Sequence, residues 1–329
     1  MDECLLEVRN LKKYFPVKQT RLRQKKSFVR AVDGVSFTLQ RGEILGLVGE
    51  SGSGKTTVGK TILNLIAPTG GAVTFEGQTL FDVEGGRQIG KRDMGLIRRN
   101  MQMVFQDPYA SLDPRMNVEK IITEGIVKFK TCPRSELHGR AEELIRECGL
   151  EADSLKKFPH QFSGGQRQRI GIARAISLEP KLIVCDEPTA ALDVSIQSQI
   201  LNLMLSLKER RGMSYLFISH NLGIVEHFCT RVCVMYLGSI VEVAPSAVLF
   251  RESAHPYTRA LLESTPSVRE GRGRERTLLS GEIPSPANPP SGCKFHPRCP
   301  YAGGRCRTET PGLHDLGGGH LAACHRCGT

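Results

Sequence analysis

The sequence has no apolar run approaching the roughly 20 residues that a helix needs to span a bilayer. Its first residues, MDECLLEV, are acidic and lack the basic-then-apolar order of a secretory signal. Of its 329 residues, 40% are hydrophobic and 24% are charged, which is a globular balance. These features exclude a wholly disordered chain and one that crosses a membrane by itself, and they predict a cytosolic protein.

The most basic segment lacks the interleaved aromatic residues that a stacking platform for nucleic-acid bases needs. Residues 12–30 hold eight Lys or Arg and no acidic residue, and they supply much of the net charge of +11. Such a segment is either a solvated loop or a binding surface. We favour the solvated loop and expect no nucleic-acid partner.

Hydrophobic periodicity predicts alternating strands and helices and shows no repeat of solenoid period. Polar and apolar residues alternate at 5–8 and 31–39, as they do in half-buried strands. Continuous apolar runs predict buried strands at 44–48, 101–105, 182–185, 215–218 and 232–236. Helical spacing is seen in Val58, Ile62, Leu65 and Ile66, and again in Ile196, Ile200, Leu203 and Leu207. The alternation predicts an α/β fold with a largely parallel sheet.

Changes in composition divide the chain further. Residues 107–172 are more polar and helical in pattern, which predicts a helical insertion between two core strands. Residues 281–290 contain four prolines and are expected to be extended and non-helical. We expect a main domain over 1–250 and a C-terminal extension over 251–329.

A phosphate-binding motif follows the predicted strand at 44–48. The segment GESGSGKT, Gly49 to Thr56, fits G-x-x-x-x-G-K-S/T and opens a predicted helix. In such a loop the backbone N–H groups wrap phosphates, the lysine neutralises the β- and γ-phosphates, and the hydroxyl ligates Mg²⁺. The residues predicted to bind ATP and Mg²⁺ are Gly49, Ser51, Gly52, Gly54, Lys55, Thr56 and Thr57.

A second acidic site ends the predicted strand at 182–185. In LIVCDE, Asp186 can hold Mg²⁺ through water, and Glu187 can polarise an attacking water. Alone, this pair would be an ordinary acidic strand end. The phosphate-binding motif upstream makes the catalytic interpretation the favoured one.

The segment between these two sites carries a family resemblance. FSGGQRQR, Phe162 to Arg169, resembles the signature motif of ATP-binding-cassette (ABC) ATPases, with phenylalanine where many members have leucine. The matching residues are Ser163, Gly164, Gly165 and Gln166. Ser-Gly-Gly ahead of a helix offers N–H donors and a hydroxyl to a phosphate. Because one chain cannot place two such helix ends around one nucleotide, we expect a head-to-tail dimer.

Other family elements follow in order. The resemblance implies that Gln106 in VFQDP ligates Mg²⁺ and reports to a membrane subunit, that Asp193 in AALD lies at the dimer interface, and that His220 in FISHN contacts the γ-phosphate. It implies adenine stacking by Phe15 in NLKKYF, with Tyr14 as the alternative. The implied catalytic residues are Lys55, Glu187 and His220, and the implied magnesium ligands are Thr56, Gln106 and Asp186.

The implied fold is a P-loop NTPase (RecA-like) core with an N-terminal antiparallel β subdomain, a helical subdomain near 107–172 and a cysteine-rich extension. A narrower resemblance is to the second ATPase subunit of oligopeptide/dipeptide importers. It is carried by YFPVK, by segments 107–116 and 255–262, and by the tail. The resemblance implies ATP-driven uptake of di- or oligopeptides or a related solute. It also implies a paralogous ATPase partner, two permease subunits, a periplasmic or extracellular solute-binding protein and a place on the cytoplasmic face of the membrane. The rivals are a soluble ABC ATPase acting on nucleic acid or ribosomes and an exporter ATPase.

Five of the 11 cysteines lie in the last 37 residues, at Cys293, Cys299, Cys306, Cys324 and Cys327. In a reducing compartment this clustering indicates metal or cluster ligation. The spacing of the first four lacks the close pair that opens most zinc sites, so we favour a 4Fe–4S cluster over zinc or free thiols. Cys327 is a spare thiol or substitute ligand, and the nearby His296, His314, His320 and His325 are expected to be solvated. Distance in sequence from the phosphate motifs predicts a purely structural role for this tail.

Overall fold

A computed structural model of the chain describes residues 3–17, 27–264 and 281–327. Residues 18–26, the centre of the basic segment, lie outside this description, so the solvated loop stays a prediction. The chain divides into two compact units. We call Met1–Glu3, Gln40–Glu43 and Ile89–Phe217 the helical unit, and Cys4–Leu39, Ile44–Gln88 and Ile218–Thr329 the sheet unit.

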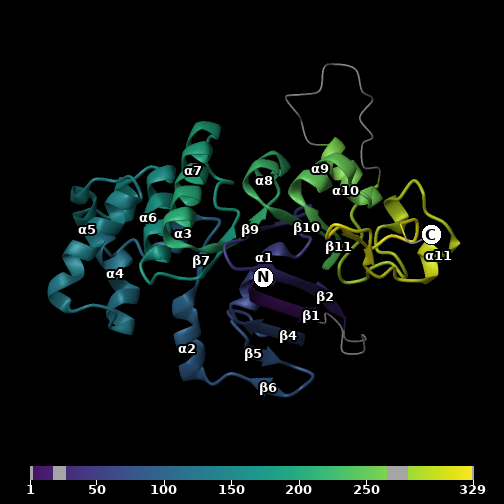
Figure 1. Cartoon of the computed structure of the whole chain (residues 1–329), viewed down its shortest axis with the longest axis horizontal. Helices are drawn as coiled ribbons and strands as arrows, with labels where there is room; N and C mark the ends of the chain where they lie inside the picture. Colours follow the sequence, from purple (N-terminus) through teal and green to yellow (C-terminus); the bar gives the residue numbers. More distant parts are fainter. Residues whose placement is uncertain (1–2, 18–26, 265–280, 328–329) are drawn as a thin grey trace. The chain divides into compact units, whose positions relative to one another are not determined.

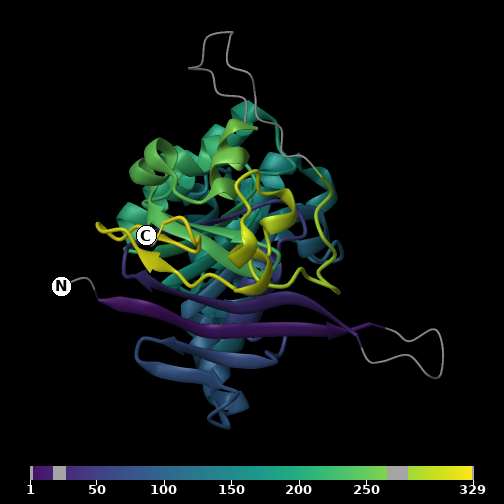
Figure 2. The same ribbon diagram turned by 90° about the vertical axis from the view of Figure 1, so that its right-hand side faces the viewer.

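The sheet unit contains a five-stranded sheet in which β1 pairs with β4, β4 with β5 and β5 with β6, all antiparallel. Leu6 lies opposite Phe75 and Val8 opposite Val73, and all four side chains are buried. Figure 2 shows the long strands β1 and β2 side by side. The expected N-terminal antiparallel subdomain is therefore confirmed. In sheet order the strands are β2 (Phe28–Gln40), β1 (Cys4–Pro16), β4 (Gly70–Phe75), β5 (Gln78–Asp82) and β6 (Arg87–Gln88).

The sheet unit also holds two parallel core strands, β3 (Ile44–Val48) and β10 (Arg231–Tyr236), with β11 (Ser239–Pro245) antiparallel to β10. Every residue of β3 is buried, as its continuous apolar run predicts. The helices of this unit are α1 (Lys55–Ile62), α8 (Leu222–Phe228), α9 (Ser246–Glu252) and α10 (Pro256–Glu263).

Helix α1 is shorter than its hydrophobic spacing predicts. It ends at Ile62, and Asn64 adopts a left-handed φ of 49° that an α-helix cannot contain. Leu65 lies beyond the end and is 49% exposed. The prediction that Leu65 and Ile66 continue the buried helical face is wrong.

The C-terminal tail, residues 281–327, adds short elements to the same unit. These are a 3₁₀ turn (His296–Arg298), α11 (Gly304–Thr308), β12 (His314–Asp315) and β13 (Leu321–Ala322). Strand β13 pairs with β11, and Figure 1 shows the yellow tail next to β11. Residues 281–290 contain no helix or strand, as their prolines predict.

The helical unit is built on the parallel pair β7 (Met101–Val104) and β8 (Leu182–Asp186), with β9 (Ser214–Ser219) next to β8. Between residues 107 and 172 the described structure contains helices and turns but no strand, so the predicted helical insertion is confirmed. Its helices are α3 (Pro108–Ser111), α4 (Val118–Phe129), α5 (Leu137–Glu147) and α6 (Gly164–Ile176), with 3₁₀ turns at Arg134–Glu136, Ala152–Lys156 and Pro159–Gln161.

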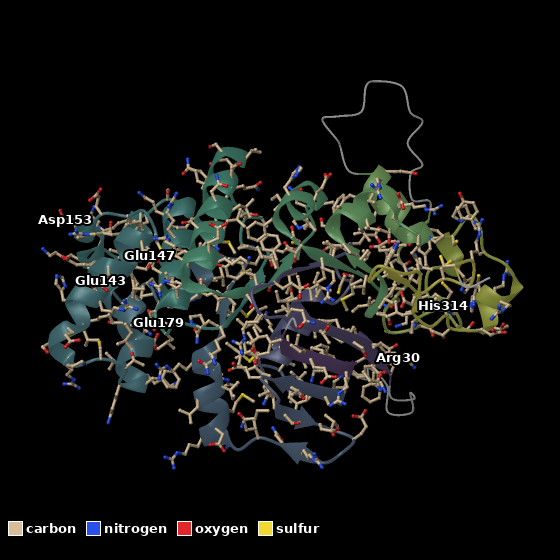
Figure 3. The ribbon with its side chains drawn as sticks, viewed as in Figure 1. Arg30, Glu143, Glu147, Asp153, Glu179 and His314 are labelled. Carbon is tan, nitrogen blue, oxygen red and sulfur yellow. The ribbon has the colours of Figure 1, made fainter. Side chains whose placement is uncertain are left out.

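Two further helices, α2 (Lys91–Asn100) and α7 (Val194–Arg211), flank this insertion in the sequence. Arg140 of α5 forms an ion pair with Glu143 in the same helix and another with Glu179, which follows the end of α6; both glutamates are labelled in Figure 3. Over the part of the chain that is described, no helix has the length and apolar character needed to cross a membrane.

Candidate active site

The phosphate loop, Gly49–Thr56, connects β3 to α1 in the sheet unit. The loop requires glycine where the backbone passes close to its neighbours. A Cβ on Gly49 would lie 2.1 Å from the Met235 carbonyl oxygen, and one on Gly54 would lie 2.0 Å from that of Ala31. Both residues also have positive φ, at 151° and 104°, which disfavours any other residue there.

Lys55, the first residue of α1, is buried. Its Nζ donates hydrogen bonds to the carbonyl oxygens of Gly49, at 2.8 Å, and of Glu50, at 3.0 Å. These bonds hold a cationic group beside the backbone N–H groups at the start of α1, where the helix dipole also favours an anion. The local geometry therefore suits phosphate, as the motif predicts.

The predicted acidic site lies at the carboxyl ends of β7 and β8 in the helical unit. Because these strands are parallel and adjacent, Gln106 after β7 comes close to Glu187 after β8. Gln106 Nε2 donates a hydrogen bond of 2.9 Å to Glu187 Oε2. Asp186, the last residue of β8, is 2% exposed. The structure thus brings together two residues that the sequence selects from motifs 81 positions apart.

The segment after Glu187 leads into α7. Asp193 caps this helix, since its carboxylate accepts hydrogen bonds from Ile196 N, at 2.9 Å, and from Ser195 Oγ, at 2.8 Å. Those bonds hold the pKa of Asp193 below its ordinary value. Gln197, which sequence reasoning missed, donates from Nε2 to the carbonyl oxygens of Thr189 and Leu192. Gln197 therefore fixes the loop that precedes Asp193, and no local sequence motif identifies Gln197.

The signature residues form the N-terminus of α6. Ser163 Oγ accepts a hydrogen bond from Gln166 N, and Gln166 Oε1 accepts one from Ser163 N, which makes a capping box. A Cβ on Gly165 would lie 2.5 Å from Ile196 Cγ2 of α7, so glycine is needed for these helices to pack. The signature segment is therefore a rigid, capped helix start.

The remaining predicted nucleotide residues lie in the sheet unit. Phe15 is half-buried with Lys13 Nζ 4.9 Å from its ring centroid, while the alternative, Tyr14, donates its hydroxyl to Asp33. Burial, with the Asp33 hydrogen bond, raises the pKa of Tyr14 to about 12. His220 is exposed directly after β9. The predicted residues thus form two groups: Phe15, the phosphate loop and His220 in one unit, and Gln106, the signature, Asp186, Glu187 and Asp193 in the other.

Cys293, Cys299, Cys306 and Cys324 line one cavity of about 20 Å³ in the tail. Burial raises the pKa of Cys293 to about 11, and the three other thiols add to that effect. Among the residues that are described, no three His, Cys, Asp or Glu side chains are placed to hold a single metal ion. Four thiols are a donor set that iron–sulfur clusters use.

The histidines near these cysteines differ from expectation in one case. His320 is only 7% exposed, because its Nε2 lies 2.7 Å from the buried Glu242 carboxylate. The prediction that it is solvated is wrong. Glu242 also accepts hydrogen bonds from the backbone N–H groups of Ala254 and His255, so it fastens the tail to the segment before α10.

Comparison with known proteins agrees with this geometry. Residues 32–190 match the ABC transporter family, and residues 241–306 match the oligopeptide/dipeptide transporter C-terminal region. The oligopeptide transport ATP-binding protein AppF of Bacillus subtilis is 48% identical over 327 residues, which are 98% of each chain. The chain belongs to the ABC transporter ATPases of the oligopeptide/dipeptide type. A probable peptide ABC transporter ATP-binding protein of Sinorhizobium fredii is also 48% identical, over 99% of this chain and 90% of its own.

Solved ABC cassettes share the fold. The structure of cbiO1 from Clostridium perfringens, part of an ABC transporter complex, matches with a TM-score of 0.64 and 26% identity over 77% of this chain and 92% of its own. The cassette MJ0796, as a dimer bound to ADP and Pi, matches with a TM-score of 0.63 and 26% identity. The match covers 74% of this chain and 99% of the MJ0796 chain. The expected P-loop NTPase fold and the family are confirmed, and this ABC ATPase is an ATP hydrolase by family. The relatives support the transport expectation, not the nucleic-acid or ribosome alternative.

Proposed function

We propose that this ABC ATPase is the ATP-hydrolysing subunit of a peptide-type importer, which takes up di- or oligopeptides or a related solute. The observation that carries the proposal is the 48% identity to an oligopeptide transport ATP-binding protein along 98% of the chain. That match includes the C-terminal region by which this type of transporter ATPase is recognised.

The residues have separable chemical roles in hydrolysis. Lys55 and the backbone N–H groups of the phosphate loop bind and neutralise phosphate oxygens. Glu187 accepts the proton of the attacking water or orients it, and the hydrogen bond from Gln106 restrains the orientation of its carboxylate. His220 aligns the γ-phosphate. Catalysis then rests on positioning and charge neutralisation, as in other phosphoryl transfers.

Oxygen donors of the kind that Mg²⁺ prefers are present in this set. Thr56 offers a hydroxyl, Asp186 a buried carboxylate at a strand end, and Gln106 its Oε1, because its Nε2 is engaged with Glu187. When bound, Mg²⁺ supplies positive charge to the phosphate oxygens. These three residues would hold it.

We infer a head-to-tail dimer with a paralogous ATPase. The capped start of α6 at Ser163, Gly164, Gly165 and Gln166 then faces the nucleotide of the partner, and Asp193 lies at the interface. Gln106 and the segment to Asn117 transmit the motion to one of two permease subunits, and Tyr109 in this segment is 61% exposed. Through the permeases the complex meets a periplasmic or extracellular solute-binding protein. In this arrangement the chain is peripheral on the cytoplasmic face of the membrane.

We also propose that Cys293, Cys299, Cys306 and Cys324 hold a 4Fe–4S cluster. The support is that all four thiols line one cavity and that four thiolates are the usual ligands of such a cluster. Metal analysis of anaerobically purified chain distinguishes the alternatives. The proposal predicts about four irons and four sulfides per chain. One zinc without iron, or neither metal, would contradict it.

Transport in a defined system tests the proposed function. The chain is co-expressed with a neighbouring ATPase, two permeases and the binding protein, and the complex is placed in vesicles. We expect uptake of labelled di- or oligopeptides that requires ATP and this chain. The Glu187→Gln variant should abolish the uptake. Stable association with ribosomes or nucleic acid, and none with the permeases, would overturn the proposal.

A further inference from the structure

The tail reaches the phosphate loop through one ion pair. Arg298, in the 3₁₀ turn between two of the clustered cysteines, donates from Nη1 to Glu50 Oε2 at 2.9 Å and from Nη2 to Glu50 Oε1 at 3.1 Å. Glu50 is the second residue of the phosphate loop. The Arg298 side chain is 4% exposed and that of Glu50 is 22% exposed. A bidentate pair with this burial is among the stronger charge contacts in proteins.

Glu50 is fixed at three separate points. Its carboxylate meets Arg298, its backbone N–H donates to Tyr257 Oη at 3.0 Å, and its carbonyl oxygen accepts from Lys55 Nζ at 3.0 Å. Only one residue therefore separates Arg298 from the lysine that neutralises phosphate. A displacement of Glu50 would move both the loop backbone and a ligand of Lys55.

An aromatic cluster supports this contact from the tail side. The rings of Tyr236, Tyr257 and Phe295 lie with centroids 4.6, 5.3 and 5.4 Å apart in pairs. Phe295 belongs to the tail, and Tyr257 is the residue that binds the N–H of Glu50. The guanidinium of Arg298 stands 5.8 Å from the Tyr236 ring. The cluster positions both of the groups that hold Glu50.

The burial of Arg298 is difficult to explain as tail anchoring alone. Its Nε is buried and has no hydrogen-bond partner among the residues that the structure describes, which costs free energy. The tail has other attachments, such as the pairing of β13 with β11 and the contact of His320 with Glu242. For packing alone, apolar residues of similar volume serve as well as a buried ion pair or better.

We propose that Arg298 is a positioning residue for the phosphate loop, so that the cysteine-rich tail sets the affinity of the chain for ATP. Arg298 neutralises the Glu50 carboxylate, which would otherwise repel phosphate, and it holds the Glu50 backbone in place for Lys55. The proposal requires that the chain bind ATP, as its family does, and it is independent of the transported solute. It makes the extension a part of the nucleotide site.

The test measures ATP affinity in the full-length chain. Arg298→Gln leaves the Glu50 carboxylate half-buried, unpaired and close to the phosphates. We expect the dissociation constant for a fluorescent ATP analogue to rise by about tenfold or more, because loss of one partner of a buried charge pair is costly. In the assembled ATPase, KM for ATP should rise while kcat changes by less than about threefold. Arg305→Gln, which breaks an exposed arginine–glutamate pair of the same tail, is the matched control.

A second substitution separates positioning from general stability. In Arg298→Gln combined with Glu50→Gln, the repelling carboxylate is gone, so most of the lost affinity should return. Arg298→Lys keeps the charge but cannot pair at two points, so it should lose an intermediate amount of ATP affinity. It replaces Arg298→Gln in the test if that variant does not fold. Unchanged affinity in both Arg298 variants would overturn the proposal. A double variant that binds no better than Arg298→Gln would also overturn it, because the effect would then not pass through Glu50.

Discussion

At the residue scale, the proposed role of Glu187 as the catalytic carboxylate depends on its position after β8, where Gln106 holds it by a hydrogen bond. Gln106 Nε2 donates to Glu187 Oε2 and so restrains the orientation of the carboxylate. Removing a general base costs on the order of 10²–10⁴ in rate. Glu187→Gln keeps the size and most hydrogen bonds of the side chain but cannot accept a proton. We expect turnover in the assembled complex to fall by that range, with ATP binding retained.

Steady-state ATPase assays and equilibrium nucleotide binding check this prediction together. Glu209→Gln, an exposed change of the same kind on α7, controls for the loss of one charge. The Glu187→Gln variant should also accumulate a closed dimer with bound ATP. Turnover close to that of the unchanged protein would refute Glu187 as the catalytic carboxylate.

The sequence predicts those site residues that lie in recognisable motifs. Lys55 and its loop, or Ser163 and Gln166, form local motifs with a fixed geometry. The partners of Glu50 are not predictable in this way, because Tyr257 and Arg298 lie 207 and 248 positions away. Gln197 is missed because a polar residue in the first turn of a helix is ordinary. The contact of the tail with the phosphate loop is hidden for the same reason, because distance in sequence is not distance in space.

At the element scale, periodicity predicts where elements lie better than where they end. The alternation at 5–8 and 31–39 and the apolar runs predict seven strands, β1, β2, β3, β7, β8, β9 and β10, but not β4, β5, β6 or β11. Helix α1 ends early because Asn64 takes a left-handed conformation, which no pattern of apolar residues reveals. Strands β12 and β13 have two residues each, too few for any periodicity. They exist because β11 offers an edge on which the tail can pair.

Packing of α6 on α7 depends on a glycine. Gly165→Ala would place a methyl 2.5 Å from Ile196 Cγ2, so the helices must move apart. Overpacking of this kind costs about 1–3 kcal/mol. Gly171→Ala, in the same helix, meets nothing within 4 Å and should leave stability unchanged or raise it by roughly 0.5–1 kcal/mol. Urea unfolding of both variants measures the difference, and equal stabilities would show that the α6–α7 contact does not constrain residue 165.

At the scale of the whole molecule, the signature segment and the phosphate loop belong to different nucleotide sites if the dimer is head-to-tail. Ser163→Arg should then leave ATP binding by the isolated chain unchanged, because the phosphate loop is not altered. Turnover in the site shared with the partner should fall by about 10²-fold, the effect of losing a donor to the transferred phosphate. Ser163→Thr, which keeps the hydroxyl and the helix cap, is the control. Loss of ATP binding in the isolated Ser163→Arg chain would contradict the head-to-tail arrangement.

The tail joins the proposed cluster to the nucleotide site, because Cys299 directly follows Arg298. Cys299→Ser should remove the brown colour and the iron from anaerobically purified chain, and it should loosen residues 281–327 to protease. Since Arg298 depends on the fold of this segment, ATP affinity should also fall, by about as much as in Arg298→Gln. Cys327→Ser is the matched control, since Cys327 is expected to be a spare thiol and its Sγ contacts the Ala254 carbonyl oxygen. It should keep iron, protease resistance and ATP affinity. Loss of iron with unchanged ATP affinity would show that the phosphate loop is held without the cluster, by the Arg298 and Tyr257 contacts alone.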